Sequence, residues 1–244
     1  MQLADVLIFA DEDKIYGINQ GYYPDIKNAI DSGSLLVLPY NGWRDTELRL
    51  KAIPHCDGKD VYIRNPYSNC FIPTSDNEIL DAFVKDKSHV IKEALVWLGA
   101  KDIVVVETVE DKDTVNASLD AASKVGLGKG SLKANLKRLA SVDITTLIES
   151  HDPLRKPKPY EKVDSYLRNH GLANETMLTV LAERLREDGL LSGSERYAVT
   201  YLNEIQFALN VLAGFDYKVF SSSLDFSLEH NHVHSITKVL DIKF

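Results

Sequence analysis

Two long stretches in which apolar and polar residues alternate constrain the fold of this chain most strongly. The first covers residues 115–137 and the second residues 205–229, and a glycine-rich or serine-rich turn interrupts each one. Because successive side chains of a β-strand point to opposite faces, this period of two predicts a β-hairpin with one apolar and one polar face in each stretch. The apolar faces include Val115, Leu119, Leu132 and Leu136 in the first hairpin and Ile205, Phe207, Leu209, Leu224 and Phe226 in the second.

The segment before the first hairpin has the periodicity of a helix. Residues 75–98 carry apolar side chains at helical spacing, and Ser75 and Glu78 have the spacing of a capping box. Gly99 follows and can adopt the left-handed conformation that ends a helix. Residues 103–106 are then continuously apolar, which predicts a strand buried on both faces.

Shorter signals predict the remaining elements. Asn174 is a good N-cap for a helix that Gly189 ends. Other strands are predicted at residues 5–10, 33–39, 60–64, 70–72, 197–201 and 236–244, and other helices at residues 24–32 and 160–170. Together the elements predict an α+β fold, in which helices pack on one face of a long, twisted antiparallel sheet.

The order of helix, glycine, strand and hairpin occurs twice, which indicates an internal pseudo-repeat. An offset of 90 residues pairs Gly99 with Gly189 and Leu119 with Leu209. Identities at this offset are close to chance in number, so the interpretation depends on the shared order of elements.

A proline-rich connector at residues 153–160 divides the chain. Three prolines stand there among basic residues, and such a segment cannot continue a helix or a central strand. We therefore expect a strand- and aromatic-rich N-terminal part over residues 1–75. Two further units would follow this part. The first is a helix and hairpin unit over residues 76–152, and the second is a unit of helices and a hairpin over residues 161–244.

Charge and composition exclude several classes of protein. The chain has 28 Lys and Arg against 36 Asp and Glu, a net charge of −8, which argues against general nucleic-acid binding. No apolar run is long enough for a membrane-spanning helix, and the N-terminus lacks the basic region of a secretory signal. Two cysteines, Cys56 and Cys70, fit a reducing compartment, so we expect a cytoplasmic protein.

The absence of a recognisable catalytic motif favours a non-catalytic, soluble protein that binds an unidentified ligand. The partner would be another protein or further copies of the same chain. Aromatic residues with polar ends suit such a surface, although core packing is their commoner use, and the N-terminal part is rich in them. They are Tyr22, Tyr23, Tyr40, Trp43, Tyr62 and Tyr67.

The hairpins also support a second function, action on membranes. Each arm holds about ten alternating residues, the length at which a tilted strand crosses a bilayer core. The first hairpin is cationic and could contact anionic lipid head groups through Lys124, Lys129, Lys133, Lys137 and Arg138. The same alternation is equally typical of long strands in a half-buried sheet.

Two hairpins on one sheet, each preceded by a helix, form an architecture that resembles gasdermins and the perforin-like proteins. Those families store future membrane strands in their folded state. The resemblance is one of architecture, and no residue role follows from it. It implies a pore-forming-like protein in which residues 115–137 and 205–229 insert or oligomerise.

A third function, a metal-dependent or thiol enzyme, is indicated by two small clusters. Alternate residues of a strand lie on one face about 7 Å apart, close enough for two imidazoles to bind one metal ion. His230, His232 and His234 have that spacing and would bind a divalent ion such as zinc, the one cofactor the sequence indicates. A solvated turn or a pH-sensitive group would use the same histidines. His55 and Cys56 form the candidate thiol pair.

Overall fold

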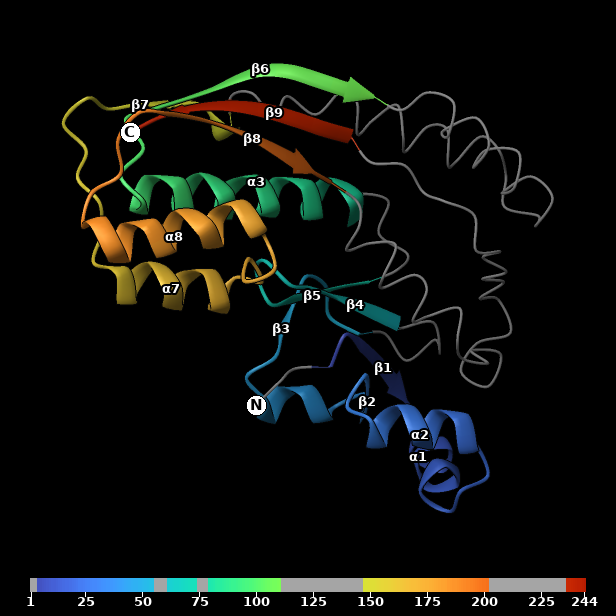
Figure 1. Ribbon diagram of the computed structural model, residues 1–244. Coiled ribbons are helices and arrows are strands. Elements are labelled where there is room, and N and C mark those ends of the chain that lie inside the picture. Colours follow the sequence, from blue (N-terminus) through green and yellow to red (C-terminus); the bar gives the residue numbers. More distant parts are fainter. Residues whose placement is uncertain (1–3, 55–60, 74–78, 111–146, 202–235) are drawn as a thin grey trace.

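The structure, a computed structural model, describes residues 4–54, 61–73, 79–110, 147–201 and 236–244 (Figure 1). The N-terminal part forms a mixed five-stranded sheet in the order β2-β1-β4-β5-β3. Its strands are β1 (Val6–Ala10), β2 (Leu35–Pro39), β3 (Arg49–Leu50), β4 (Val61–Asn65) and β5 (Cys70–Pro73). The crossover between β1 and its parallel neighbour β2 consists of α1 (Glu12–Asn19) and α2 (Pro24–Asp31).

Both faces of this sheet are covered, which explains why all five residues of its strand β1 are buried. Val6 and Ile8 point into the main core, which also contains residues of α1 and α2. Leu7 and Phe9 point the other way, into a smaller cluster that includes Tyr62. The segment from β2 through the 3-10 helix η1 (Gly42–Asp45) to β3 packs against that second cluster.

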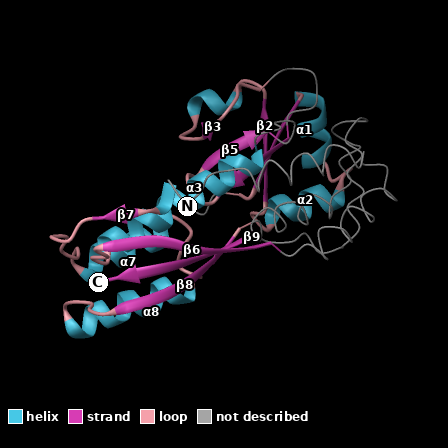
Figure 2. Ribbon diagram, turned by 90° about the horizontal axis from the view of Figure 1, so that it is seen from above, coloured by secondary structure: helices cyan, strands magenta, loops and turns pink. Residues whose placement is uncertain are grey.

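A four-stranded sheet in the order β7-β6-β9-β8 forms the second layer, and all of its neighbouring strands are antiparallel. Its strands are β6 (Asp102–Glu110), β7 (Ser150–His151), β8 (Ser194–Thr200) and β9 (Ile236–Lys243). The helices α3 (Ile79–Trp97), α7 (Tyr160–Asn169) and α8 (Thr176–Asp188) lie on one face of it (Figures 1 and 2). The predicted α+β class, with an antiparallel sheet, is thus confirmed.

One prediction about strand β6 is wrong, because the helices of the described ranges pack on one face of the sheet and leave the other face of this strand exposed. Ile103 is buried against them, as expected. Val104 and Val106, however, are 38% and 45% exposed on the strand, so the continuous apolar run does not mark burial on both faces.

The helix α3 lies between the two sheets and joins them into one core (Figure 1). Phe83 and Val84 near its first turns and Leu95 and Leu98 near its end are all buried in that core. Asn65, at the end of β4, donates to the Asp86 carboxylate of the helix over 2.8 Å. The predicted stop after the helix is confirmed, since Gly99 has φ +93°.

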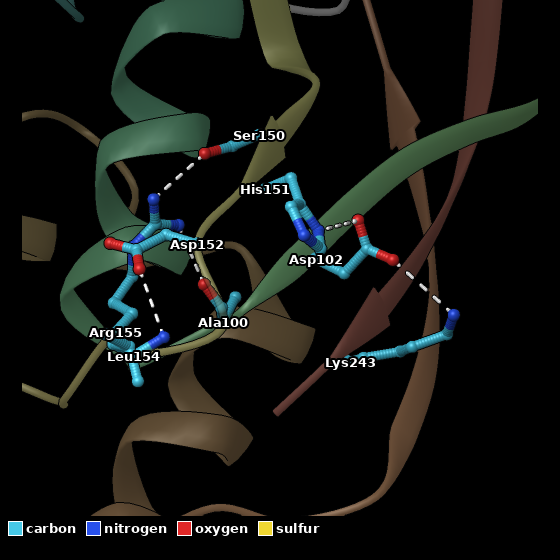
Figure 3. A network of polar contacts seen from close by, with 8 residues as sticks. All are labelled: Ala100, Asp102, Ser150, His151, Asp152, Leu154, Arg155 and Lys243. Atoms are coloured by element: carbon cyan, nitrogen blue, oxygen red, sulfur yellow. Dashed lines mark hydrogen bonds and ion pairs between the residues drawn. The ribbon is translucent and has the colours of Figure 1, made fainter.

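The proline-rich connector packs against the end of α3. Lys158 donates its backbone N–H to the Trp97 carbonyl over 2.7 Å. Arg155, in the same segment, donates to the Ala100 carbonyl over 2.7 Å and to the Ser150 hydroxyl over 3.0 Å (Figure 3). Residues 153–160 therefore form a strap fixed to the fold.

Polar contacts also fasten this end of the four-stranded sheet. The Asp102 carboxylate lies 3.5 Å from His151 Nδ1 and 3.4 Å from Lys243 Nζ, so it links the start of β6 to the ends of β7 and β9 (Figure 3). All three side chains are at least partly exposed, and contacts of this kind contribute about 1 kcal/mol or less each.

The described residues contain the order of elements that the pseudo-repeat predicts, apart from the hairpins. α3, Gly99 and β6 follow one another as α8, Gly189 and β8 do, and both glycines have positive φ. β6 and β8 lie on either side of β9 and run in the same direction. Duplication and the domain boundaries remain predictions.

Candidate functional site: a buried lysine at the end of strand β8

Apart from the aromatic residues of the N-terminal part, the candidate site residues named from the sequence lie outside the described part of the chain. These are both hairpins with their apolar faces, the five cationic residues between 124 and 138, and the pair His55 and Cys56. The cluster of His230, His232 and His234 lies outside it too. Within the described ranges, no group of three or more His, Cys, Asp or Glu side chains is placed to hold a metal ion. No helix of those ranges is long and apolar enough to cross a membrane.

Cys70, the cysteine that the structure describes, has the properties of a structural thiol. Burial raises its pKa, and the nearby Asp86 carboxylate raises it further, while Arg49 and Lys51 act in the opposite direction. A raised pKa reduces the thiolate fraction at neutral pH, and the thiolate is the nucleophilic form.

The most unusual side chain in the described core is Lys87, in the middle of α3. Its side chain is only 3% exposed, although lysine is almost never buried unless it is paired. Its ammonium donates to the Thr200 carbonyl over 2.7 Å and lies 3.0 Å from Glu175 Oε1. These contacts satisfy a charge whose burial would otherwise cost several kcal/mol.

Aromatic rings complete the surroundings of the ammonium. Lys87 Nζ lies 5.6 Å from the centre of the Tyr67 ring and 6.0 Å from that of Tyr201, within the range of cation–π attraction. The Tyr201 and Ser88 hydroxyl oxygens are 3.1 Å apart, and burial raises the pKa of Tyr201. The Tyr197 hydroxyl donates to Glu175 Oε2 over 2.8 Å. We call Lys87, Glu175, Tyr197, Thr200 and Tyr201 the lysine junction.

Three elements meet at this junction. Lys87 comes from α3, Glu175 is the N-cap residue of α8, and Thr200 is the last residue of β8. The register pairs Thr200 with Thr237 of β9. The lysine junction therefore holds the point at which the chain leaves the four-stranded sheet toward residues 202–235.

The turn between β4 and β5 contacts the junction through Tyr67. Asn65, which is fully buried, accepts from the Tyr67 backbone N–H over 3.1 Å. The Tyr67 carbonyl lies 3.1 Å from His170 Nδ1, and the His170 ring stacks on Tyr166 with centroids 4.3 Å apart. Because a carbonyl only accepts, Nδ1 carries the proton, and Nε2 is the nitrogen left for other partners.

One feature of the sequence indicates this junction, namely a lysine at a position of α3 that the helical periodicity assigns to apolar residues. Phe83, Lys87 and Ile91 are spaced by four residues, so the lysine occupies a position on the buried stripe of α3. A charged residue at such a position indicates a buried partner. The partner Glu175 could not be named, because it is 88 residues away in the sequence.

Comparisons of this chain with protein-family models, with curated proteins and with solved structures found no match.

Proposed function

We propose that this protein acts on membranes by inserting residues 115–137 and 205–229 as β-hairpins. The observation that carries the proposal is the position of the three strand ends from which these segments depart and return. In the four-stranded sheet Glu110 is paired with Ile236, and Thr200 is paired with Thr237. Both alternating segments therefore start from the same end of one antiparallel sheet.

That arrangement suits concerted insertion. Two segments that start side by side can extend in the same direction, and each has arms of about ten residues, enough for a tilted strand to cross a bilayer core. The opposite end of the sheet is fastened by the contacts of Asp102 and Arg155, so it can act as the fixed base (Figure 3).

Self-association follows from the same topology. Backbone groups at the edge of a membrane strand need partners, because hydrocarbon offers none. In an antiparallel sheet of four strands, the two edge strands run in opposite directions. Copies placed side by side would continue the antiparallel pattern, so the partner in the membrane is a further copy of the chain.

The charge of the first hairpin supports a preference for anionic lipid. Five basic residues stand between positions 124 and 138 with no acidic residue among them. Near an anionic surface each contributes about 1 kcal/mol of attraction, in a protein whose overall net charge is −8. Release from anionic vesicles should therefore exceed release from neutral ones.

Dye release from vesicles tests the proposal. The disrupting variant carries Leu119→Asp and Leu209→Asp on the apolar faces, and the matched control carries Asn116→Asp and Asn210→Asp on the polar faces. We expect the parent and the control to release dye from anionic vesicles and the disrupting variant to lose release while its circular dichroism is unchanged. No release by the parent at any lipid charge or pH would contradict the proposal.

Exposed aromatic residues favour a second candidate, a non-catalytic protein that binds a protein partner. Tyr16 on α1 is 63% exposed and Tyr22 is 71% exposed, whereas Tyr62 and Tyr67 are buried in the core. Exposed tyrosines commonly form the centre of protein interfaces. A photo-crosslinking residue at position 22 would capture the partner, and Tyr16→Ser should abolish the crosslink. Absence of any crosslinked species would exclude this surface.

A further inference from the structure

A depression of about 460 Å³ lies where the turn between β4 and β5 meets β3 and the end of α7. Its walls carry Glu47, Arg49, Tyr67, Ser68, Asn69 and His170, which come from three separate parts of the chain. None of these residues belongs to the hairpin segments, and the ligand chemistry of the depression can be inferred independently of the proposed function.

Several donors of this depression have no protein partner within the described residues. Arg49 is exposed, and its guanidinium makes no hydrogen bond or ion pair with them, although its backbone pairs with β5. Ser68 Oγ is buried without a hydrogen bond, so a rotation about χ1 toward the depression would break none. The Asn69 side chain accepts from Arg64 through Oδ1 over 3.3 Å, which leaves its two amide N–H groups as donors.

The geometry of the neighbouring groups is fixed. Asn69 is held in the left-handed region at φ +53° by a hydrogen bond from its backbone N–H to the Asn65 carbonyl over 2.8 Å. The His170 ring is held by Tyr166 and by the Tyr67 carbonyl, so Nε2 is its one remaining polar atom. A site with ordered polar walls loses less entropy when it binds a ligand.

We propose that this depression binds the phosphate group of a small phosphorylated molecule that carries a hydroxyl group beside the phosphate. The Arg49 guanidinium matches the paired oxygens of a phosphate, and Ser68, Asn69 and His170 supply further donors. Glu47 would repel a bare dianion, but its carboxylate accepts a hydrogen bond from a hydroxyl group. The mixture of donors and one acceptor therefore favours a phosphorylated polyol over inorganic phosphate.

Titration calorimetry with glycerol 3-phosphate, inorganic phosphate and glycerol, all at one ionic strength, tests the site without membranes. We expect glycerol 3-phosphate to bind more tightly than inorganic phosphate. Arg49→Gln should weaken binding about tenfold, because it removes a charge-assisted pair. Arg44→Gln, which removes the same charge from an exposed residue outside the depression, should leave the affinity unchanged.

A second variant and a vesicle-binding measurement complete the test. Glu47→Gln should reduce the preference for glycerol 3-phosphate over inorganic phosphate. The repulsion it removes acts on both ligands, whereas the weaker hydrogen bond to the ligand hydroxyl group affects glycerol 3-phosphate alone. Vesicles with and without phosphatidic acid, separated by flotation, show whether the same phosphate is recognised on a lipid head group. Failure of every phosphate probe to bind, or an equal loss in Arg44→Gln, would overturn the proposal. Neither result bears on dye release by the hairpins.

Discussion

Replacement of Lys87 by methionine tests whether the lysine junction holds the fold together. Methionine retains a buried, unbranched apolar side chain of similar length and removes the ammonium that lies near the Tyr67 and Tyr201 rings. The two largest losses are the hydrogen bond to the Thr200 carbonyl and the ion pair with Glu175, and the cation–π attraction to the Tyr67 and Tyr201 rings is lost with them.

The expected cost can be estimated from these two losses. A part-buried carbonyl left without its donor costs about 1–3 kcal/mol. The Glu175 side chain is 24% exposed, so water partly replaces the ammonium and its share is about 1 kcal/mol. The sum is about 3 kcal/mol, which corresponds to a fall in Tm of roughly 6–12 °C for a chain of this size.

Urea unfolding followed by circular dichroism measures this cost, and two further variants define its origin. Lys27→Met removes one partner of an exposed pair with Asp31, whose side chains are 46% and 60% exposed, so it should cost less than about 0.5 kcal/mol. Adding Glu175→Gln to Lys87→Met should recover about 1 kcal/mol, because the double variant no longer leaves an unpaired carboxylate.

Two results would refute the reasoning. The first is a cost for Lys87→Met no larger than that for Lys27→Met, which would mean that water reaches the ammonium in the folded state. The second is additivity of Lys87→Met and Glu175→Gln, which would mean that the two side chains do not interact.

Three further predictions follow from the backbone and from the titrating groups. Gly99→Ala should destabilise the fold by more than Gly189→Ala. Both glycines have positive φ, but at Gly99 the new Cβ would also lie 3.1 Å from Pro157, whereas at Gly189 it would meet no atom within 4 Å. Equal free energies of unfolding for the two variants would contradict this prediction. Burial raises the pKa of Tyr166 to about 12 and also raises the pKa of Tyr201. The folded state therefore retains protons that the unfolded state releases above pH 10, so the free energy of unfolding should fall as the pH rises from about 10 to 12. An unchanged urea midpoint across that pH range would contradict this prediction. In a Cys56→Ser background, Cys70 should react with iodoacetamide at pH 8 more slowly than a free thiol, because burial raises its pKa; mass spectrometry that shows equal or faster alkylation would disprove it.

Local patterns predicted most of the described elements, because each signal lies within the element itself. The helix expected at residues 24–32 is α2 (Pro24–Asp31), where proline occupies the first turn. Gly189 ends α8 with φ +71°, as predicted, although the N-cap is Glu175 and not the expected Asn174. Ser75 and Glu78, the predicted capping box of α3, lie outside the described residues.

Other features could not be predicted, because tertiary contacts determine them. The helix α1 is not among the elements predicted from the sequence, and Asp11 caps it by accepting from the Lys14 backbone N–H over 2.8 Å. The apolar run at residues 103–106 did not indicate which face of the strand β6 the helices would cover. Glu175 meets Lys87 only once α3 and α8 pack on the same sheet.

Environment-sensitive fluorescence at single positions of the first hairpin tests whether this segment inserts into a bilayer as a β-strand. In a background with Cys56→Ser and Cys70→Ser, one cysteine at a time would be placed at positions 115 to 119 and labelled with a fluorophore that reports polarity. On anionic vesicles the account predicts apolar emission at positions 115, 117 and 119 and polar emission at positions 116 and 118, since strand residues alternate between lipid and water. Emission that does not alternate, or that is the same with and without vesicles, would contradict insertion of this segment as a membrane strand.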